Sequence, residues 1–194
     1  MTTIHFRPMA AAAALAVCGM ASVGCTTSGP DDRASAASSH AAVDAQIDAT
    51  LSKLYGAVPG AREMGASSKG MLIFPSVVGG SFVVGAEYGR GALRTQGMTR
   101  SYYSIAAGSL GPQVGAQSKA IVYLFTTQEA LDKFLASKGW TAGVDATVAL
   151  ANIGANGHVD TATMRAPVVG FVLANAGLEV GASVQGMKIT QSPM

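Results

Sequence analysis

The chain has 194 residues, of which 49% are hydrophobic and only 12% are charged. Its formal net charge of +2 excludes a nucleic-acid-binding protein that relies on a strongly basic surface. Long-range attraction to anionic lipid is equally weak, so any site for a polyanion must be local. Much of the glycine, 24 residues in all, lies within apolar runs rather than in linkers, which predicts a strongly curved sheet or partial barrel.

Residues 1–24 have the layout of a secretory signal peptide. Arg7 precedes an alanine-rich apolar stretch that is short for a membrane span, and Gly24 supplies the small residue before a cleavage point. Ser22-Val23-Gly24-Cys25 resembles a bacterial lipobox, so we expect lipidation of Cys25; a plain secreted protein cut elsewhere is the alternative. Thr26 is not the Asp that retains many lipoproteins at the inner membrane. We therefore expect an outer-membrane lipoprotein that faces the periplasm or is exposed at the cell surface.

Residues 25–40 are expected to form a flexible tether, because Ser, Ala, Gly, Pro and Asp dominate the segment without apolar periodicity. A single domain is expected over residues 41–194. Apolar residues at helical spacing predict an amphipathic helix from Ala41 to Tyr55. A second, short helix is expected from Pro59 to about Ala66.

The chain from Lys69 onward has the pattern of strands. Strands are expected at Gly70–Phe74 (closed by Pro75), Ser81–Arg94, Thr99–Ile105, Ala120–Phe125, Gly143–Ala151, Pro167–Ala174 and Leu178–Gln185. Gln96-Gly97 predicts a turn between two of them. One helix interrupts the series, with Thr126 as its expected N-cap, Glu129 completing a capping box and Gly139 closing it. These elements predict an α+β fold: a curved, glycine-rich, mostly antiparallel sheet or partial barrel with a few packed helices.

Catalytic motifs are missing from the sequence. His158 and Asp160 offer two metal ligands where zinc needs three or four, so we expect a solvated turn there. Ser109 lacks the glycine two residues earlier that a nucleophile elbow requires. Asp145 lies in an apolar stretch, and we expect it to be buried with a hydrogen-bonding or cationic partner. Without a P-loop or dinucleotide fingerprint, we expect no enzymatic activity, no cofactor, no metal and no small-molecule substrate.

The densest basic patch combines three arginines with two tyrosines: Arg90, Arg94, Arg100, Tyr102 and Tyr103. A two-residue hairpin at Gln96-Gly97 would place Arg94 opposite Thr99 and Arg90 opposite Tyr103, with Arg100 on the other face. A loop one residue longer would bring all three arginines to one side. Arginine forks bind phosphate oxygens and tyrosine rings lie at interfaces, which suits lipid headgroups. An ordinary solvated hairpin is the alternative.

Several motifs, in order along residues 59–191, resemble the SYLF domain family. They are Ala66-Ser67-Ser68-Lys69-Gly70-Met71-Leu72-Ile73-Phe74-Pro75, Gly85-Ala86-Glu87-Tyr88-Gly89-Arg90-Gly91-Ala92-Leu93, Tyr102-Tyr103-Ser104-Ile105-Ala106-Ala107-Gly108-Ser109, Gly115-Ala116-Gln117-Ser118-Lys119, Ala130-Leu131 with Phe134, and the ending from Gly177-Leu178 to Lys188-Ile189-Thr190. Gly139-Trp140 followed by Gly143-Val144-Asp145-Ala146 is the most specific match.

The resemblance implies a non-catalytic module that binds phospholipid or a membrane surface. Fungal and animal SYLF members bind phosphoinositides and, in some proteins, actin filaments or their regulators, whereas bacterial members are envelope lipoproteins. Candidate headgroup contacts are the five residues of the basic patch together with Lys119. In animal members an amphipathic helix before the domain engages the bilayer. The corresponding helix here carries Asp44 and Asp48 against one Lys53, which disfavours anionic headgroups and leaves packing on the domain as its alternative role.

A second function is kept beside the first. The chain could serve as a protein-interaction or structural module of the envelope whose only lipid contact is the acyl group on Cys25. Its partner would then be an envelope or host protein rather than a phospholipid membrane. The two functions differ in whether the domain without its acyl group still binds membranes.

Overall fold

The computed structural model describes residues 30–81, 84–110, 116–151, 159–174, 177–179 and 182–192. The expected signal peptide, the expected lipidation at Cys25 and the expected turn at His158 lie outside these residues. The helices are α1 (Pro30–Ala57), α2 (Ala61–Ser67), α3 (Gln128–Ala136) and α4 (Thr161–Met164). The strands are β1 (Gly70–Ser81), β2 (Val84–Thr95), β3 (Met98–Leu110), β4 (Ala116–Phe125), β5 (Trp140–Thr141), β6 (Val148–Leu150), β7 (Val168–Ala174), β8 (Gly177–Leu178) and β9 (Lys188–Gln191).

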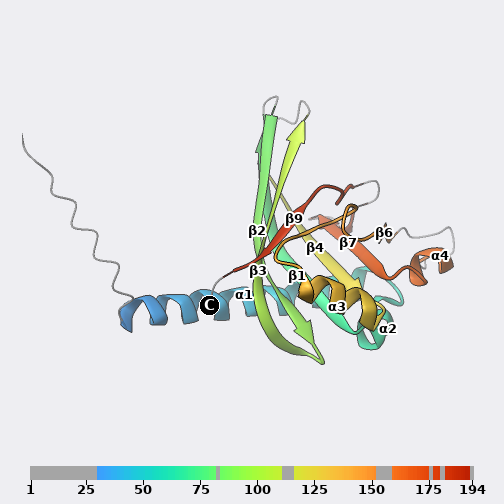
Figure 1. Ribbon diagram of the computed structural model, residues 1–194, viewed down its shortest axis with the longest axis horizontal. Coiled ribbons are helices and arrows are strands. Elements are labelled where there is room, and N and C mark those ends of the chain that lie inside the picture. The colour runs from blue at the N-terminus through green and yellow to red at the C-terminus, as the bar shows by residue number, and fades with distance from the viewer. Residues whose placement is uncertain are drawn as a thin grey trace, which may run out of the picture.

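The strands form one strongly curled sheet in the order β5-β9-β3-β2-β1-β4-β7-β6, with β8 paired to β7 (Figure 1). Neighbouring strands are antiparallel except β6 and β7, which run parallel. The α+β prediction of a curved, mostly antiparallel sheet is thereby confirmed. Strands β1, β2 and β3 are the longest, with 12 or 13 residues each, and one end of them projects well beyond the other elements (Figure 1).

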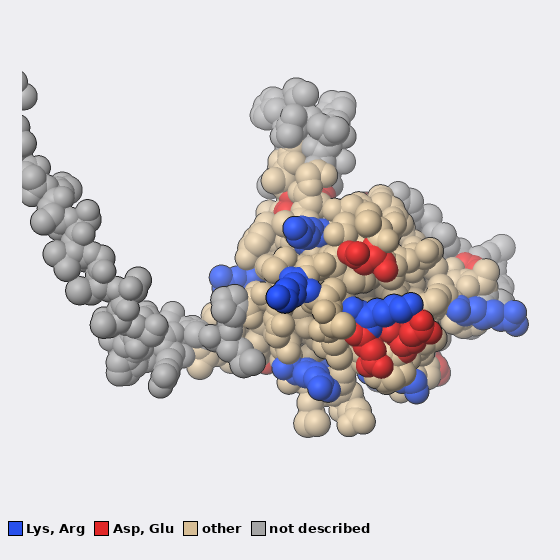
Figure 2. Space-filling view, viewed as in Figure 1, with Lys and Arg blue, Asp and Glu red and all other residues tan. Residues whose placement is uncertain are grey.

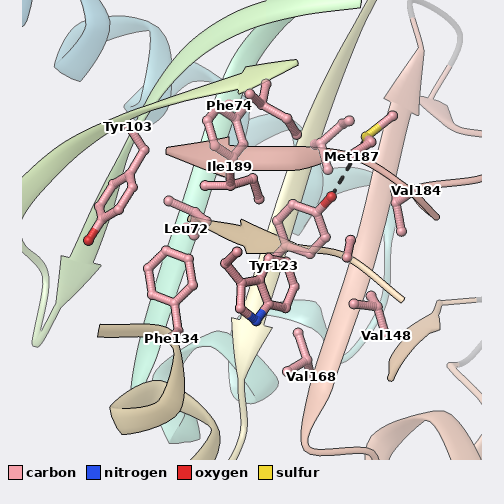
Figure 3. Close-up of a cluster of buried hydrophobic side chains, with 14 of the residues drawn as sticks. Leu72, Phe74, Tyr103, Tyr123, Phe134, Val148, Val168, Val184, Met187 and Ile189 are labelled. Atoms are coloured by element: carbon pink, nitrogen blue, oxygen red, sulfur yellow. Dashed lines mark hydrogen bonds between the residues drawn. The ribbon is translucent and has the colours of Figure 1, made fainter. Parts of the chain in front are cut away.

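The concave, inner face of the sheet encloses an aromatic core. The rings of Tyr123, Phe125, Phe134 and Trp140 pack at centroid distances of 5.0 to 6.4 Å. Figure 3 shows Tyr123 and Phe134 among aliphatic side chains such as Leu72 of β1, Val168 of β7 and Ile189 of β9. Burying each large apolar side chain contributes roughly 1.5–3 kcal/mol, so this cluster is a major source of stability.

A second apolar cluster lies on the outer face of the sheet, under α1. Ile47, Leu51 and Leu54 recur at helical spacing and are buried against Ile73 and Val122 of β1 and β4. Because successive strand residues point to opposite faces, each central strand supplies both clusters, for example Leu72 to the inner one and Ile73 to the outer one.

The flexible tether predicted over residues 25–40 is corrected from residue 30 onward, because α1 begins at Pro30 rather than at Ala41. Proline is well placed in the first turn of a helix, and the alanines that follow are strong helix formers. Residues 30–40 contain no large apolar side chains at helical spacing, so hydrophobic periodicity does not predict this part of the helix. Side-chain packing supports it at His40, whose ring stacks on Tyr102 with centroids 3.8 Å apart.

Three further local expectations are corrected. The N-cap of α3 is Thr127, whose hydroxyl accepts from the Ala130 N–H, whereas the Thr126 hydroxyl donates to the Ala166 carbonyl. Helix α2 begins at Ala61 rather than at Pro59. β1 does not end at Pro75 but continues through it with a shift of register between Ile73 and Ser76. Proline donates no ladder hydrogen bond, and a bulge is where a strand tolerates it.

The expectations after α3 are wrong in two places. Asp145 is exposed in a turn rather than buried in a strand, and its carboxylate accepts from the Thr141 N–H at 2.6 Å. Gly143 adopts φ +80° there, a conformation that ends the strand pattern. The predicted strand from Leu178 to Gln185 stops at Leu178, and Gly186 turns the chain at φ +77° before β9. Residues 182–185 alternate between apolar and polar side chains but do not pair with another strand, so alternation alone does not identify a strand here.

Candidate functional site

The β2–β3 hairpin has the two-residue turn that the sequence predicts. Gln96 and Gly97 both have positive φ, 53° and 79°, as a type I′ turn requires, and Arg94 pairs with Thr99. The register then shifts, because Leu93 pairs with Ser101 and leaves Arg100 as the extra residue of a bulge. Arg90 consequently faces Ser104, not the predicted Tyr103.

Arg94 is held by α1 rather than presented to solvent. Its guanidinium donates to the Asp48 carboxylate and lies 3.7 Å from the Asp44 carboxylate, and its side chain is 11% exposed. Asp44 and Asp48 lie one turn apart on α1, so a single arginine fork reaches both. The acidic residues that set this helix apart in the sequence thus dock it on β2, which confirms packing on the domain.

Tyr102 belongs to the same contact. Its hydroxyl donates to Asp44 at 2.8 Å, and the Thr99 hydroxyl donates to the other oxygen of that carboxylate at 2.7 Å. Burial, the hydrogen bond to Asp44 and the negative charge of Asp44 raise the pKa of Tyr102 to about 12. Burial alone would raise the pKa of Asp44, but the hydrogen bonds from Thr99 and Tyr102 and the charge of Arg94 outweigh it, so this pKa lies below its ordinary value.

Lys119 and Tyr103 face the inside of the curled sheet. Lys119 Nζ donates a hydrogen bond to Glu87 Oε1 at 3.0 Å. It also lies 3.0 Å from Glu87 Oε2, which accepts no hydrogen bond from the described residues and interacts with the lysine through charge. Gly79 makes room for this pair, since a Cβ at that position would come within 2.7 Å of Glu87 Cγ. Tyr103 is 6% exposed and packs on Phe134 with centroids 5.1 Å apart, and burial raises its pKa.

Arg90 and Arg100 are the two predicted headgroup residues that are exposed, and neither forms an ion pair within the described part of the chain. Sequence reasoning missed Lys138 and Lys188, which are exposed in the same way. The Lys188 side chain lies beside Gly139, the residue that follows Lys138, because its Cε is 3.6 Å from the place of a Cβ on Gly139. The signal that could have found Lys188 is its alternation with the buried Ile189.

The exposed cations do not gather in one pocket. Figure 2 shows the blue side chains of this face as separate patches, while red side chains gather in the region of α3 and α2. The structure therefore brings Arg94 and Tyr102 together with α1, places Lys119 and Tyr103 on the inner face, and leaves Arg90 and Arg100 on the surface. What remains for an external ligand is a dispersed, weakly cationic surface.

In the described residues, no helix is both long and apolar enough to cross a membrane. Groups of three or more His, Cys, Asp or Glu side chains with the geometry to hold a metal ion do not occur among them.

Residues 106–193, from the later part of β3 to the end of the sheet, match the model of the family described as Ysc84: Las17-binding protein actin regulator. The part of the SYLF resemblance that lies between residues 59 and 105 is outside that match. Among curated proteins, none matches the chain. The resemblance to the SYLF domain family is confirmed over residues 106–193, where the chain is similar to the Ysc84 family.

Proposed function

We propose that the chain is a non-enzymatic, lipid-anchored protein of the cell envelope whose SYLF-type domain binds phospholipid surfaces. The observation that carries the proposal is the exposure of Arg90 and Arg100 without an ion-pair partner in the described residues. The anchor is proposed at Cys25, and the outer membrane is the proposed location. The similarity of residues 106–193 to this family supports a lipid-binding or actin-regulator type of domain.

Weak contacts suffice for such a protein. Each arginine or lysine near an anionic bilayer contributes about 1 kcal/mol, so two exposed arginines supply roughly 2 kcal/mol. An acyl anchor keeps the domain at the membrane and raises its effective concentration there, which turns these contacts into a stable orientation. Residues whose charges are already matched, such as Arg94 and Lys119, add little to the attraction.

The test is vesicle co-sedimentation of the unacylated chain beginning at Thr26, which retains every described contact. We expect the protein to pellet with anionic phosphatidylglycerol vesicles at low salt and to be released at high salt. Arg90→Ala/Arg100→Ala should weaken pelleting, whereas Lys69→Ala/Arg165→Ala removes the same charge from two other exposed positions that form no ion pair within the described residues, and should weaken it less. If the two double variants lose pelleting equally, binding depends on the net charge of the protein and not on the positions of Arg90 and Arg100.

A protein-interaction module is the second candidate, because the family description names a protein partner. In that case the acyl group is the only lipid contact. Absence of pelleting at every salt concentration and lipid composition would favour this function and exclude the first.

A further inference from the structure

The projecting end of the sheet has an outer face that α1 does not cover. Strand pairing places Ala106, Tyr88, Val78 and Ser118 side by side in one row across β3, β2, β1 and β4. Lys188 of β9 extends the row beyond Ala106. All of these side chains are exposed, and their inner-face neighbours, such as Val77 and Ile105, are buried.

Polarity changes in steps along the strands of this outer face. The row nearest the projecting end holds Gly108, Ala86 and Gly80, all exposed and all small. The next row holds Tyr88 and Val78, which are directly paired and are 53% and 50% exposed. The third row holds Arg90 between Ser104 and Ser76. Successive rows on one face lie two residues apart, or about 7 Å.

Charge on this face has one sign. Lys188 in the second row and Arg90 in the third form no ion pair within the described chain, and none of the described residues in the three rows is acidic. Glu87, which follows Ala86 on β2, points to the inner face and pairs with Lys119. The outer face is therefore apolar toward the end of the projection and cationic toward its base.

We propose that this outer face enters the interfacial layer of an anionic phospholipid bilayer, with Val78 and Tyr88 at the boundary of headgroups and acyl chains. The inference rests on the proposed function and adds the surface that performs it. Lys188, in the same row as Val78 and Tyr88, and Arg90, in the next row toward the base, then reach the level of the phosphates. Tyrosine favours this boundary, where its ring is in an apolar layer and its hydroxyl is wet.

A bilayer fits this face better than a folded partner does. The bilayer changes from apolar acyl chains to anionic phosphates over a few ångströms, and the protein face changes from apolar to cationic over a similar distance. The backbone also permits entry, since β1 and β2 are hydrogen-bonded to strands on both sides and expose few unpaired amides. Strand pairing sets the exposed side chains of Val78 and Tyr88 next to each other, which joins two apolar groups on this face.

The experiment uses a single fluorescent label. The chain from Thr26 contains no cysteine, because its two cysteines are Cys18 and Cys25. Val78→Cys carries the environment-sensitive dye NBD, and Ala66→Cys, exposed at the opposite end of β1, carries the same dye as the control. With phosphatidylglycerol vesicles we expect a blue shift and quenching by spin-labelled lipid at position 78 only. Tyr88→Cys repeats the measurement if Val78→Cys does not fold.

The outcomes separate this inference from the proposed function. Pelleting with a response at position 78 and none at position 66 supports both. Pelleting without a response at positions 78 and 88, or with equal responses at all labelled sites, overturns the inference and leaves the proposed function standing. Failure to pellet overturns both. Val78→Asp/Tyr88→Asp should also weaken vesicle binding about tenfold while the far-ultraviolet circular dichroism is unchanged.

Discussion

Tyr102 of β3 donates a 2.8 Å hydrogen bond to the carboxylate of Asp44 on α1. The other oxygen of this carboxylate accepts from Thr99 at 2.7 Å and lies 3.7 Å from the Arg94 guanidinium. A single side chain of the helix therefore binds both strands of the β2–β3 hairpin. The contact explains why two residues of the predicted headgroup site, Arg94 and Tyr102, serve the fold instead.

Replacing Asp44 by alanine should destabilise the protein. The change removes two hydrogen bonds to a charged acceptor and leaves Asp48 as the one carboxylate beside Arg94, whose guanidinium keeps its hydrogen bond to the backbone carbonyl of residue 44. Solvent screens a carboxylate that is 32% exposed, so we expect a loss in the free energy of unfolding of about 1–2 kcal/mol. Urea denaturation followed by circular dichroism measures it. Asp132→Ala, an exposed acidic residue on α3, should change the same quantity by less than about 0.5 kcal/mol.

Acid should weaken this contact in a defined pH range. The pKa of Asp44 is lower in the folded protein than its ordinary value of 3.8, so the folded state favours the charged carboxylate. The contribution is complete above about pH 4 and is lost as the pH falls through the folded pKa. The difference in unfolding free energy between the parent and Asp44→Asn should accordingly be largest near pH 7 and shrink below pH 4. A difference that grows on acidification would contradict the assigned hydrogen bonds.

Gly91 should not tolerate a side chain. A Cβ at this position would lie 2.1 Å from the Ile73 carbonyl oxygen and 2.6 Å from Phe74, beside the register shift of β1. We expect Gly91→Ala to lower the free energy of unfolding by about 3 kcal/mol. Gly108→Ala is the control, because nothing lies within 4 Å of its added methyl group, and should change stability by less than about 0.5 kcal/mol. Equal effects would show that glycine content, not this close approach, shapes the sheet.

Local chemistry made much of the fold predictable. Gly97 indicated the turn because glycine adopts positive φ without strain, although Gln96 takes the same rare conformation at φ 53°. The spacing of Ile47, Leu51 and Leu54 indicated the buried side of α1. The bulge at Arg100 was not predictable, because register depends on which neighbours the whole strand meets. That single extra residue moved Arg90 away from its expected partner.

The candidate site was less predictable than the fold. Basic residues near one another in the sequence were grouped, yet the structure separates them by face and by partner. Lys119 and Glu87 lie 32 positions apart, so only the pairing of β1 with both β2 and β4 reveals their contact. Conversely, Lys188 and Tyr88 share a row although they are distant in the sequence. Sequence patterns report the face of a side chain but not its cross-sheet neighbours.

The Glu87–Lys119 pair gives a prediction that separates structural from lipid-binding lysines. The two side chains are 16% and 19% exposed, so Lys119→Met leaves a largely buried carboxylate without its cation and should cost about 2 kcal/mol of unfolding free energy. Glu87→Gln/Lys119→Met should recover most of that loss, because no unpaired charge remains. Urea denaturation of the four proteins completes a double-mutant cycle. If Lys119 instead contacts lipid, Lys119→Met would weaken vesicle binding and leave the free energy of unfolding nearly unchanged. Adding Glu87→Gln would then not restore vesicle binding.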